Sequence, residues 1–212
     1  MKGRADELYD IIRPVKRGAT IILAAGDFPK KGGAAWRLLT AAKRVVCCDS
    51  AADAYRRRLK KEPTVVVGDC DSVRGRFAAV VKVDEQDTND LAKAVRYCAA
   101  RGWKDPVILG ATGKREDHSI GNVFRALVFG LTVVTDRGRF VPVEGRAAFA
   151  VKKGTPVSVF APDPATRMTS KGLEWPLDGV RFSDLHCATL NRANAVRVTL
   201  TASRRVSVFI AS

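Results

Sequence analysis

Short apolar runs alternate with helix-like stretches as far as Asp136, and this alternation constrains the fold more than any other feature of the chain. The helix-like stretches cover residues 34–42, 51–61, 89–101 and 117–129, and the apolar runs end at Ala25, Cys48, Val67, Val83, Leu109 and Thr135. Such alternation is typical of a sheet whose parallel strands are joined by right-handed helical crossovers. The sequence therefore predicts a doubly wound α/β domain with a mostly parallel sheet.

The pattern changes after Asp136, where no helical periodicity follows. β-type segments recur instead, separated by Gly, Pro and Asp turns, at residues 140–143, 147–151, 157–160, 195–200 and 206–210. This spacing is typical of a smaller antiparallel β-sandwich. We expect an α/β domain over residues 1–137, including a short helical pattern at 8–12, and an all-β domain over residues 138–212.

Acidic or glycine-rich turns follow four of the predicted strands. Parallel sheets bind ligands outside the carboxyl ends of their strands, so these turns should meet at one edge. Carboxylates that converge there would repel one another unless a cation lay among them. The sequence therefore predicts a divalent-metal site that holds a polyphosphate, built from the turns at Asp49, Asp69 to Asp71, Asp87 to Asp90 and Gly110 to His118.

Asp69 and Asp71 are candidate Mg²⁺ ligands. In extended backbone, residues at i and i+2 direct their side chains to the same side, so both carboxylates would reach one ion. The alternative is an Asp-rich turn that caps its own backbone. The same Asp-x-Asp spacing also occurs in sugar-nucleotide transferases, so the motif does not fix the reaction.

Asp90 is the third candidate metal ligand, with Lys93 one helical turn further on to neutralise phosphate. The alternative is a simple helix start, in which Thr88 caps the helix and Asp90 opposes its dipole. Asp49 has two interpretations as well: it binds the nucleotide, or it caps the helix that follows.

The turn from Gly110 to His118 enters a helix and can present backbone N–H groups to an anion. It is not a Walker A sequence, because four residues do not separate its glycines. Thr112 and Lys114 are candidate nucleotide ligands here, and Arg115 would add charge-assisted hydrogen bonds to phosphate oxygens.

Bulk composition narrows the choice of partners. The formal net charge is +15, with 37 Lys and Arg residues against 22 Asp and Glu. These basic residues are scattered and aromatic residues make up only 7%, which argues against a nucleic-acid-binding role and for steering of a phosphorylated substrate.

The apolar runs are too short to cross a bilayer, and the first residues lack the apolar core of a signal peptide. We therefore expect a cytoplasmic protein with no membrane partner.

The segment from Ser170 to Leu177 is the part of the all-β domain with the composition of a recognition site. Trp175 lies there between Gly and Pro residues. Two interpretations stay open: the indole stacks on an aromatic ring of a ligand, or it belongs to the core of the sandwich.

Taken together, these segments resemble the thiamin pyrophosphokinase family. Its Gly-Asp-x-Asp-Ser turn is matched by 68–72, and its Asp-x-Thr-(x)-Asp-x-x-Lys helix start by 87–93. Its glycine-rich Arg-x-Asp-His turn is matched by 110–118, and its Ser-x-Gly-Leu-x-Trp segment by 170–175. The chain departs from the family's Ala-Asp-Gly-Gly-Ala-Asn at 48–53, and from its Ser-Asn at Leu190-Asn191.

The resemblance implies an enzyme that transfers a diphosphate from ATP to the hydroxyl of thiamine, giving thiamine diphosphate and AMP. It implies Mg²⁺ on Asp69, Asp71 and Asp90, with Asp71 or Asp90 also a candidate proton acceptor.

The remaining roles follow the same resemblance. Asp49, Lys93, Thr112, Lys114 and Arg115 would contact ATP, and Asp117 would orient Arg115 or the substrate. Ser170, Trp175 and Asn191 would bind thiamine, in a homodimer whose acceptor site lies near the interface. The alternatives are a Mg²⁺-dependent nucleotide-sugar or nucleotidyl transferase and a basic nucleic-acid-binding protein.

Overall fold

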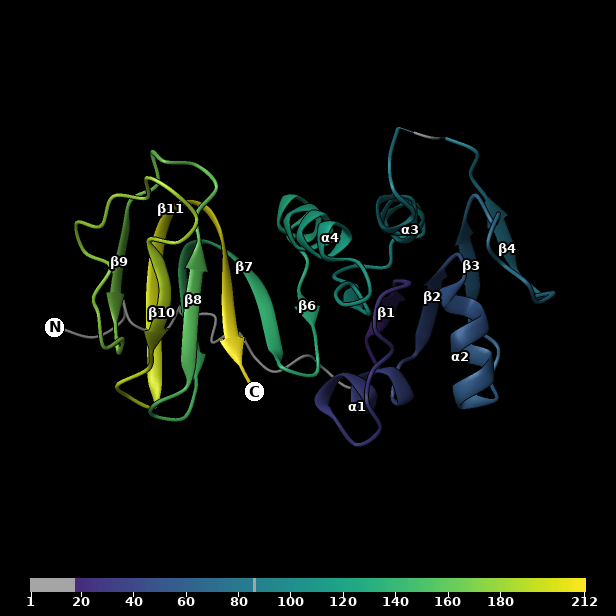
Figure 1. Ribbon diagram of the computed structural model, residues 1–212, viewed down its shortest axis with the longest axis horizontal. Coiled ribbons are helices and arrows are strands. Elements are labelled where there is room, and N and C mark those ends of the chain that lie inside the picture. The colour runs from purple at the N-terminus through teal and green to yellow at the C-terminus, as the bar shows by residue number, and fades with distance from the viewer. Residues whose placement is uncertain (1–17, 86) are drawn as a thin grey trace, which may run out of the picture. The chain divides into compact units, whose positions relative to one another are not determined.

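The computed structural model describes residues 18–85 and 87–212, so the helical pattern expected at 8–12 lies outside the described residues. The described chain divides into two compact units, 18–136 and Arg137–Ser212. The helices and strands of both units carry the labels of Figure 1.

The first unit contains a parallel sheet in the spatial order β6-β5-β1-β2-β3-β4. Each pair of neighbouring strands within it runs parallel. The strands are β1 (Thr20–Leu23), β2 (Arg44–Cys48), β3 (Val65–Gly68), β4 (Val80–Lys82), β5 (Val107–Leu109) and β6 (Val133–Val134).

Helices cover both faces of this sheet (Figure 1). They are α1 (Ala34–Thr40), α2 (Ala51–Leu59), α3 (Asp90–Ala100) and α4 (Glu116–Phe129). Side chains of α1 and α2 share one core cluster with alternate residues of the strands, such as Ile21 and Leu23 of β1. The central strands are buried on both faces, and this is why they read as continuous apolar runs in the sequence.

The strand order reverses beside β1, because the chain proceeds from β1 to β2, β3 and β4 before β5 returns to the other side of β1. Such a switch point leaves a crevice outside the carboxyl ends of the two flanking strands. Here the two loops that leave β1 and β5 are joined by backbone hydrogen bonds, from Gly26 N to Gly110 O at 2.8 Å and from Asp27 N to Thr112 O at 2.8 Å.

The second unit is all-β, and its strands pair antiparallel. They are β7 (Gly138–Ala150), β8 (Pro156–Phe160), β9 (Met168–Lys171), β10 (Ala188–Arg192) and β11 (Arg197–Ala211). The first half of β11 pairs with β9 and the second half with β8, while β7 runs beside both halves. The long β7–β11 pair therefore contributes to both layers of a sandwich around one apolar core.

The sequence pattern predicted two separate strands in place of β7, and two in place of β11. The pairing continues through the expected break, with a register shift between Ala202 and Val206 and a positive φ of 71° at Gly145. A bulge thus bends the strands where the sequence suggests a turn. Strands β9 and β10 were not predicted, because their sequences MTSK and ATLNR carry little apolar character.

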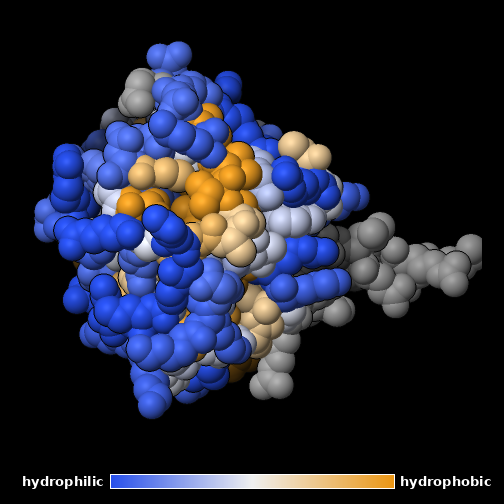
Figure 2. Space-filling view, turned by 90° about the vertical axis from the view of Figure 1, so that its right-hand side faces the viewer, coloured by the Kyte–Doolittle hydropathy of each residue, from blue (hydrophilic) through white to orange (hydrophobic). Residues whose placement is uncertain are grey.

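No helix among the described residues is long and apolar enough to span a membrane. Seen from the side on which β4 lies in Figure 1, the surface is mostly hydrophilic around one hydrophobic area (Figure 2). All five cysteines are free thiols, and Cys47, Cys48 and Cys98 are buried.

Candidate active site

Three carboxylates from three different turns gather at the carboxyl edge of the parallel sheet. Asp49 follows β2, Asp69 follows β3, and Asp90 begins α3. Each offers one oxygen, and these oxygens all lie within 4.8 Å of one another. This spacing is suited to a single divalent cation that takes oxygen ligands.

The pairing of β2 with β3 explains why Asp49 belongs to this group. Cys48 is in register with Val67, so the residues that follow each of them, Asp49 and Gly68, meet at the edge of the sheet. The Asp49 N–H donates to the carbonyl of Val67 at 3.1 Å, and the residue adopts a positive φ of 45°. A Cβ on Gly68 would lie 3.2 Å from the Cβ of Asp49 and 3.2 Å from Oδ1 of Asp90. Glycine at this position therefore leaves the space between the two carboxylates open.

The Asp49 carboxylate is buried, with 8% of the residue exposed, and its two oxygens differ in their partners. Oδ2 accepts a hydrogen bond from the hydroxyl of Ser72. Oδ1 is buried and has no hydrogen-bond partner among the described residues. A buried carboxylate oxygen without a partner is costly unless a ligand supplies one.

Asp90 is held at the start of α3 by its neighbours. The helix cap expected at Thr88 is Asn89, whose side chain accepts a hydrogen bond from Ala92 N at 3.1 Å. Asp90 forms an ion pair with the buried Lys93, with 3.2 Å between Oδ1 and Nζ. Burial raises the pKa of the Asp90 carboxyl, Lys93 opposes that rise, and the nearby Asp69 and Asp49 add to it. Carboxylates crowded in this way favour a bound cation.

Asp71 is exposed and is not part of the group of three. The expectation that Asp69 and Asp71 lie on one side assumed extended backbone between them. Cys70 instead adopts a left-handed conformation with φ 63°, and the Asp71 N–H donates to Oδ1 of Asp69 at 3.3 Å. The turn therefore does not follow the alternation of a strand, and the structure joins Asp49, rather than Asp71, to Asp69 and Asp90.

A cavity of about 440 Å³ opens beside these carboxylates. Ala24 and Ala25, which follow β1, lie in its wall, so the cavity occupies the switch point of the sheet. Asp69, Asp90 and Lys93 line it, and α4 contributes His118, Asn122 and Arg125.

The glycine-rich turn between β5 and α4 lies next to this cavity. Thr112 accepts the backbone hydrogen bond from Asp27, and the Lys114 ammonium donates to the carbonyl of Ala25 at 2.7 Å. Arg115 and Asp117 form an exposed ion pair with 2.5 Å between Nη2 and Oδ2, and this pairing lowers the pKa of Asp117 to about 2. Asp117 thus holds the guanidinium of Arg115, and among the described residues neither side chain is in the cavity wall.

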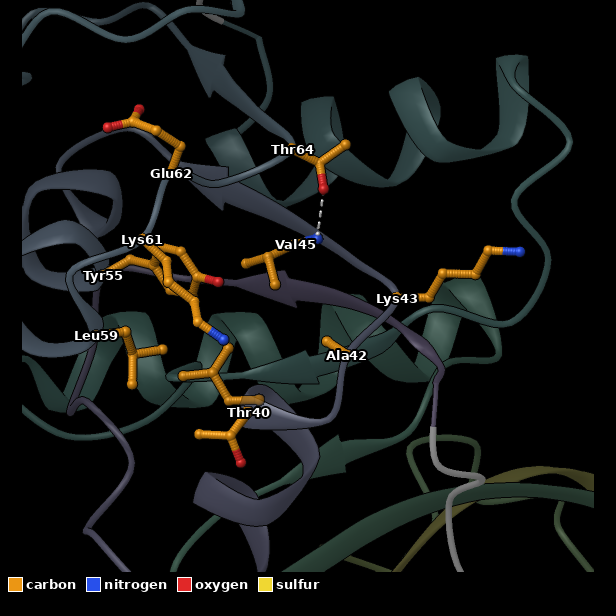
Figure 3. A pocket seen from close by; sticks show the side chains of 10 residues that line it. Thr40, Ala42, Lys43, Val45, Tyr55, Leu59, Lys61, Glu62 and Thr64 are labelled. Atoms are coloured by element: carbon orange, nitrogen blue, oxygen red, sulfur yellow. Dashed lines mark hydrogen bonds between the residues drawn. The ribbon is translucent and has the colours of Figure 1, made fainter.

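A second cavity of about 150 Å³ lies at the amino ends of β2 and β3 (Figure 3). At this cavity, Val45 N of β2 donates a hydrogen bond to Oγ1 of Thr64, the residue before β3, at 2.9 Å. Glu62 supplies a carboxylate there, while the ammonium of Lys43 is directed away from the other side chains drawn. Among the described residues, the group of three carboxylates lies at the opposite end of the sheet, so the candidate active site is at the carboxyl ends.

In the second unit, the Trp175 side chain is 50% exposed, which excludes the interpretation that it belongs to the sandwich core. Its backbone is firmly held: Asn191, which is buried, accepts from Trp175 N at 3.2 Å and donates to Trp175 O at 2.7 Å. The hydroxyl of Ser170 accepts from Leu177 N at 2.9 Å. The guanidinium of Arg192 lies 5.5 Å from the centre of the indole ring. Ser170 and Asn191 thus fix the loop that presents Trp175.

Comparison with known protein families matches both units. The family model described as thiamin pyrophosphokinase, catalytic domain, matches residues 35–133, and the one described as thiamin pyrophosphokinase, substrate-binding domain, matches residues 138–209. The chain belongs to the thiamin pyrophosphokinase family. The acidic edge lies within the catalytic domain of the family, and the Trp175 loop lies within its substrate-binding domain.

Solved structures of thiamin pyrophosphokinases share the fold at low sequence identity. The yeast enzyme aligns with a TM-score of 0.77 at 13% identity, covering 97% of this chain and 92% of the other. The enzyme from Geobacillus thermodenitrificans aligns at 0.74 with 19% identity, covering 92% and 97%. The enzyme from Candida albicans aligns at 0.72 with 13% identity, covering 92% and 89%. No curated protein matches the chain in sequence.

The two matched domains of the thiamin pyrophosphokinase family account for both parts of the chain. The alternatives, a nucleotide-sugar or nucleotidyl transferase and a nucleic-acid-binding protein, are therefore not favoured. The residues of the acidic edge also fit a divalent cation, independently of the family assignment. Oδ1 of Asp49 has no hydrogen-bond partner among the described residues, and Gly68 leaves free the space that a Cβ would fill beside Asp49 and Asp90, so a divalent cation there would supply the missing partner.

Two residues that line this cavity, Asn122 and Arg125, were not predicted as site residues. Together with His118 they occupy positions i, i+4 and i+7 of α4, which share one helical face. That spacing was available in the sequence. The spacing alone did not indicate a site, because only the tertiary structure places this face of α4 beside the start of α3.

Proposed function

We propose that the chain transfers a diphosphate group from ATP to thiamine at the carboxyl edge of its parallel sheet. The reaction is that of the thiamin pyrophosphokinase family. The thiamine hydroxyl oxygen bonds to the β-phosphorus, the bond from that phosphorus to the oxygen shared with the α-phosphate breaks, and AMP leaves with that oxygen. The observation that carries the proposal is the convergence of Asp49, Asp69 and Asp90 within 4.8 Å.

These three carboxylates would hold Mg²⁺, which binds through carboxylates and substrate phosphates. When bound, the ion would offset negative charge on the phosphate oxygens, and phosphoryl transfer depends mainly on such charge neutralisation and alignment. Lys93 opposes the rise in the pKa of Asp90 and holds its carboxylate in place through their 3.2 Å contact. Lys114 and Arg115 lie on the loop beside the cavity, where they would approach the outer phosphates.

Of the two candidate acceptors for the proton of the thiamine hydroxyl, Asp71 and Asp90, we favour Asp71. It follows the metal-binding Asp69 by two residues but is exposed and outside the group of three. Asp90 suits this role less well, because it is already paired with Lys93 and faces Asp49 and Asp69.

The second unit would bind thiamine through Trp175. The exposed indole offers a face for the pyrimidine or the cationic thiazolium ring, and a cation over Trp gains electrostatic attraction. Ser170 and Asn191 act as positioning residues, since their hydrogen bonds go to the backbone of the loop. We propose further that the protein is a homodimer in which the acidic edge and the Trp175 loop of different chains meet.

The test separates the metal ligand from the proton acceptor. AMP formation should require ATP, Mg²⁺ and thiamine together. Asp49→Asn and Asp71→Asn should each slow turnover by about a hundredfold or more. Only Asp49→Asn should also abolish the rise in melting temperature that Mg²⁺ produces.

The control is Asp105→Asn, in an exposed loop whose φ of 50° suits Asn as well as Asp. It should leave both measurements unchanged. Normal turnover of Asp49→Asn in saturating Mg²⁺ would contradict the proposed metal site, and AMP release without thiamine would contradict the proposed acceptor.

A further inference from the structure

The face of α4 that borders the cavity carries a cation that none of the recognised motifs includes. Arg125 lies two turns after His118, and both residues line the cavity that also contains Asp90 and Lys93. The family resemblance in this part of the chain ends at His118. Arg125 is therefore assigned no function by the motifs.

The position of this face is fixed by Asn122, which lies between the two residues along the helix. Its amide donates to the carbonyl of Ala111 at 3.0 Å, and its oxygen accepts from the side chain of Asn89 at 3.1 Å. Ala111 belongs to the loop after β5, and Asn89 caps α3. One side chain thus joins α4 to both neighbouring parts of the site, and Arg125 follows it by less than one turn.

The other cations near the cavity already have partners. Lys93 is paired with Asp90 at 3.2 Å, and Arg115 with Asp117 at 2.5 Å. Lys114 donates to the carbonyl of Ala25. In the part of the chain that the structure describes, Arg125 has no ion pair, although it is half-buried in the cavity wall.

A half-buried guanidinium without an anionic partner favours an anionic ligand. Mg²⁺ on three carboxylates would leave that group with a net charge of about −1, so it cannot by itself neutralise the charge of a nucleoside triphosphate. An arginine presents several N–H donors in a planar fork that matches phosphate oxygens.

We infer that Arg125 binds the polyphosphate chain of the nucleotide in this cavity. It is a binding residue for the β- and γ-phosphate oxygens, which the transferred diphosphate carries with it, and it does not contact the adenosine part. This inference rests on the proposed function.

The test measures binding without turnover. ATP and AMP are titrated separately by calorimetry into wild type and Arg125→Gln, in saturating Mg²⁺ and without thiamine. Arg125→Gln should weaken ATP binding about tenfold to a hundredfold, the range of a charge-assisted hydrogen bond, and leave AMP binding within about twofold. Arg125→Lys should recover part of the loss, because it keeps the charge but loses the fork.

Arg57→Gln, at an exposed arginine on α2, is the matched control and should bind both nucleotides like wild type. Melting curves check that the variants are folded. If Arg125→Gln does not fold, the ratio of ATP to AMP affinity in Arg125→Lys decides the question.

The possible failures are distinguishable. If wild type binds ATP equally with and without Mg²⁺, the proposed metal site fails. If wild type needs Mg²⁺ but Arg125→Gln binds ATP normally, or loses ATP and AMP equally, the role of Arg125 is overturned and the proposed function is unaffected.

Discussion

Ser72 donates its hydroxyl hydrogen bond to one oxygen of Asp49 and leaves the other oxygen buried without a partner among the described residues. This contact joins the turn after β3 to the turn after β2. It leaves Oδ1 as the Asp49 oxygen that a bound ion would engage, so Ser72 acts on the acidic group through Asp49. A hydrogen bond to the oxygen of a metal-binding carboxylate orients that ligand and tunes its affinity for the metal.

Ser72→Ala should therefore weaken Mg²⁺ binding about tenfold or more, the usual effect of losing such a contact. Calorimetric titration of Mg²⁺ measures the change, and the melting temperature of the metal-free protein should barely move, because Ser72 is exposed. Ser203→Ala makes the same chemical change in the second unit and should leave Mg²⁺ affinity as it is. Equal Mg²⁺ affinity in Ser72→Ala and wild type would remove Ser72 from the site.

Gly68→Ala should close the space between two of the carboxylates. The added Cβ would approach both Asp49 and Oδ1 of Asp90 at 3.2 Å, so one of them must shift. We expect Mg²⁺ binding and AMP formation to fall by about a hundredfold or more, while circular dichroism stays native.

Gly121→Ala is the matched control for this change. Nothing lies within 4 Å of a Cβ at Gly121, which is inside α4. That variant should be active, and it should be as stable as wild type or more so, since alanine favours helix. An active Gly68→Ala enzyme with unaltered Mg²⁺ affinity would show that the metal lies elsewhere.

The pH dependence of metal binding should follow Asp90, whose pKa is raised by burial. The folded protein then holds a proton on this group more readily than the unfolded chain. The stability that Asp90 contributes is therefore fully present below the unfolded pKa and lost as pH rises through the higher folded pKa. Mg²⁺ needs the ionised carboxylate, so it reverses this trend.

Melting curves with and without Mg²⁺ test this relationship. The rise in melting temperature on adding Mg²⁺ should be larger at about pH 7 than at about pH 5, because protons compete with the metal at the lower pH. A rise that is independent of pH over this interval would contradict a metal site that includes Asp90.

Trp175→Ala should weaken thiamine binding by about 1–3 kcal/mol, the range of a cation or ring stacked on an indole. ATP affinity and melting temperature should change little, because the side chain is half exposed and the loop backbone is held by Asn191. Trp103→Ala provides the contrast, since Trp103 packs edge to face on Tyr97 at 5.8 Å and beneath Arg44. It should lower stability and spare thiamine binding. A large melting loss in Trp175→Ala with unchanged thiamine affinity would refute the stacking role.

The proposed homodimer predicts complementation between two weak variants. Asp49→Asn and Trp175→Ala chains, co-expressed with different tags, should form mixed dimers in which one site has both residues intact. At thiamine concentrations well below saturation, activity should recover to about a quarter of wild type, as random pairing of two chains gives. No recovery in purified mixed dimers would show that each site is built within one chain, and a monomeric mass in solution would remove the dimer altogether.

Most of the fold was determined by patterns that the sequence displays directly. The continuous apolar runs of β1, β2 and β3 identify strands buried on both faces, and the helical periodicity between them requires a parallel sheet. Parallel strands bring their carboxyl ends to one edge, so the gathering of acidic turns was also predictable. The bent β7–β11 pair was not predictable from the sequence, because a bulge inside a strand and a turn between strands use the same small and polar residues.

The membership of the acidic group was decided by tertiary structure. Asp49 joins Asp69 because Cys48 and Val67 are in register on neighbouring strands, and Asp71 leaves the group because Cys70 turns into the left-handed region. Register between strands and a single backbone dihedral depend on packing across the sheet, which no local pattern encodes. Arg125 illustrates the same limit: its residue type was visible, but its place in the cavity wall depends on how α4 packs, with Asn122 bonded to Ala111 and Asn89. The sequence determined which chemistry lies at this edge, and the fold decided which side chains carry it.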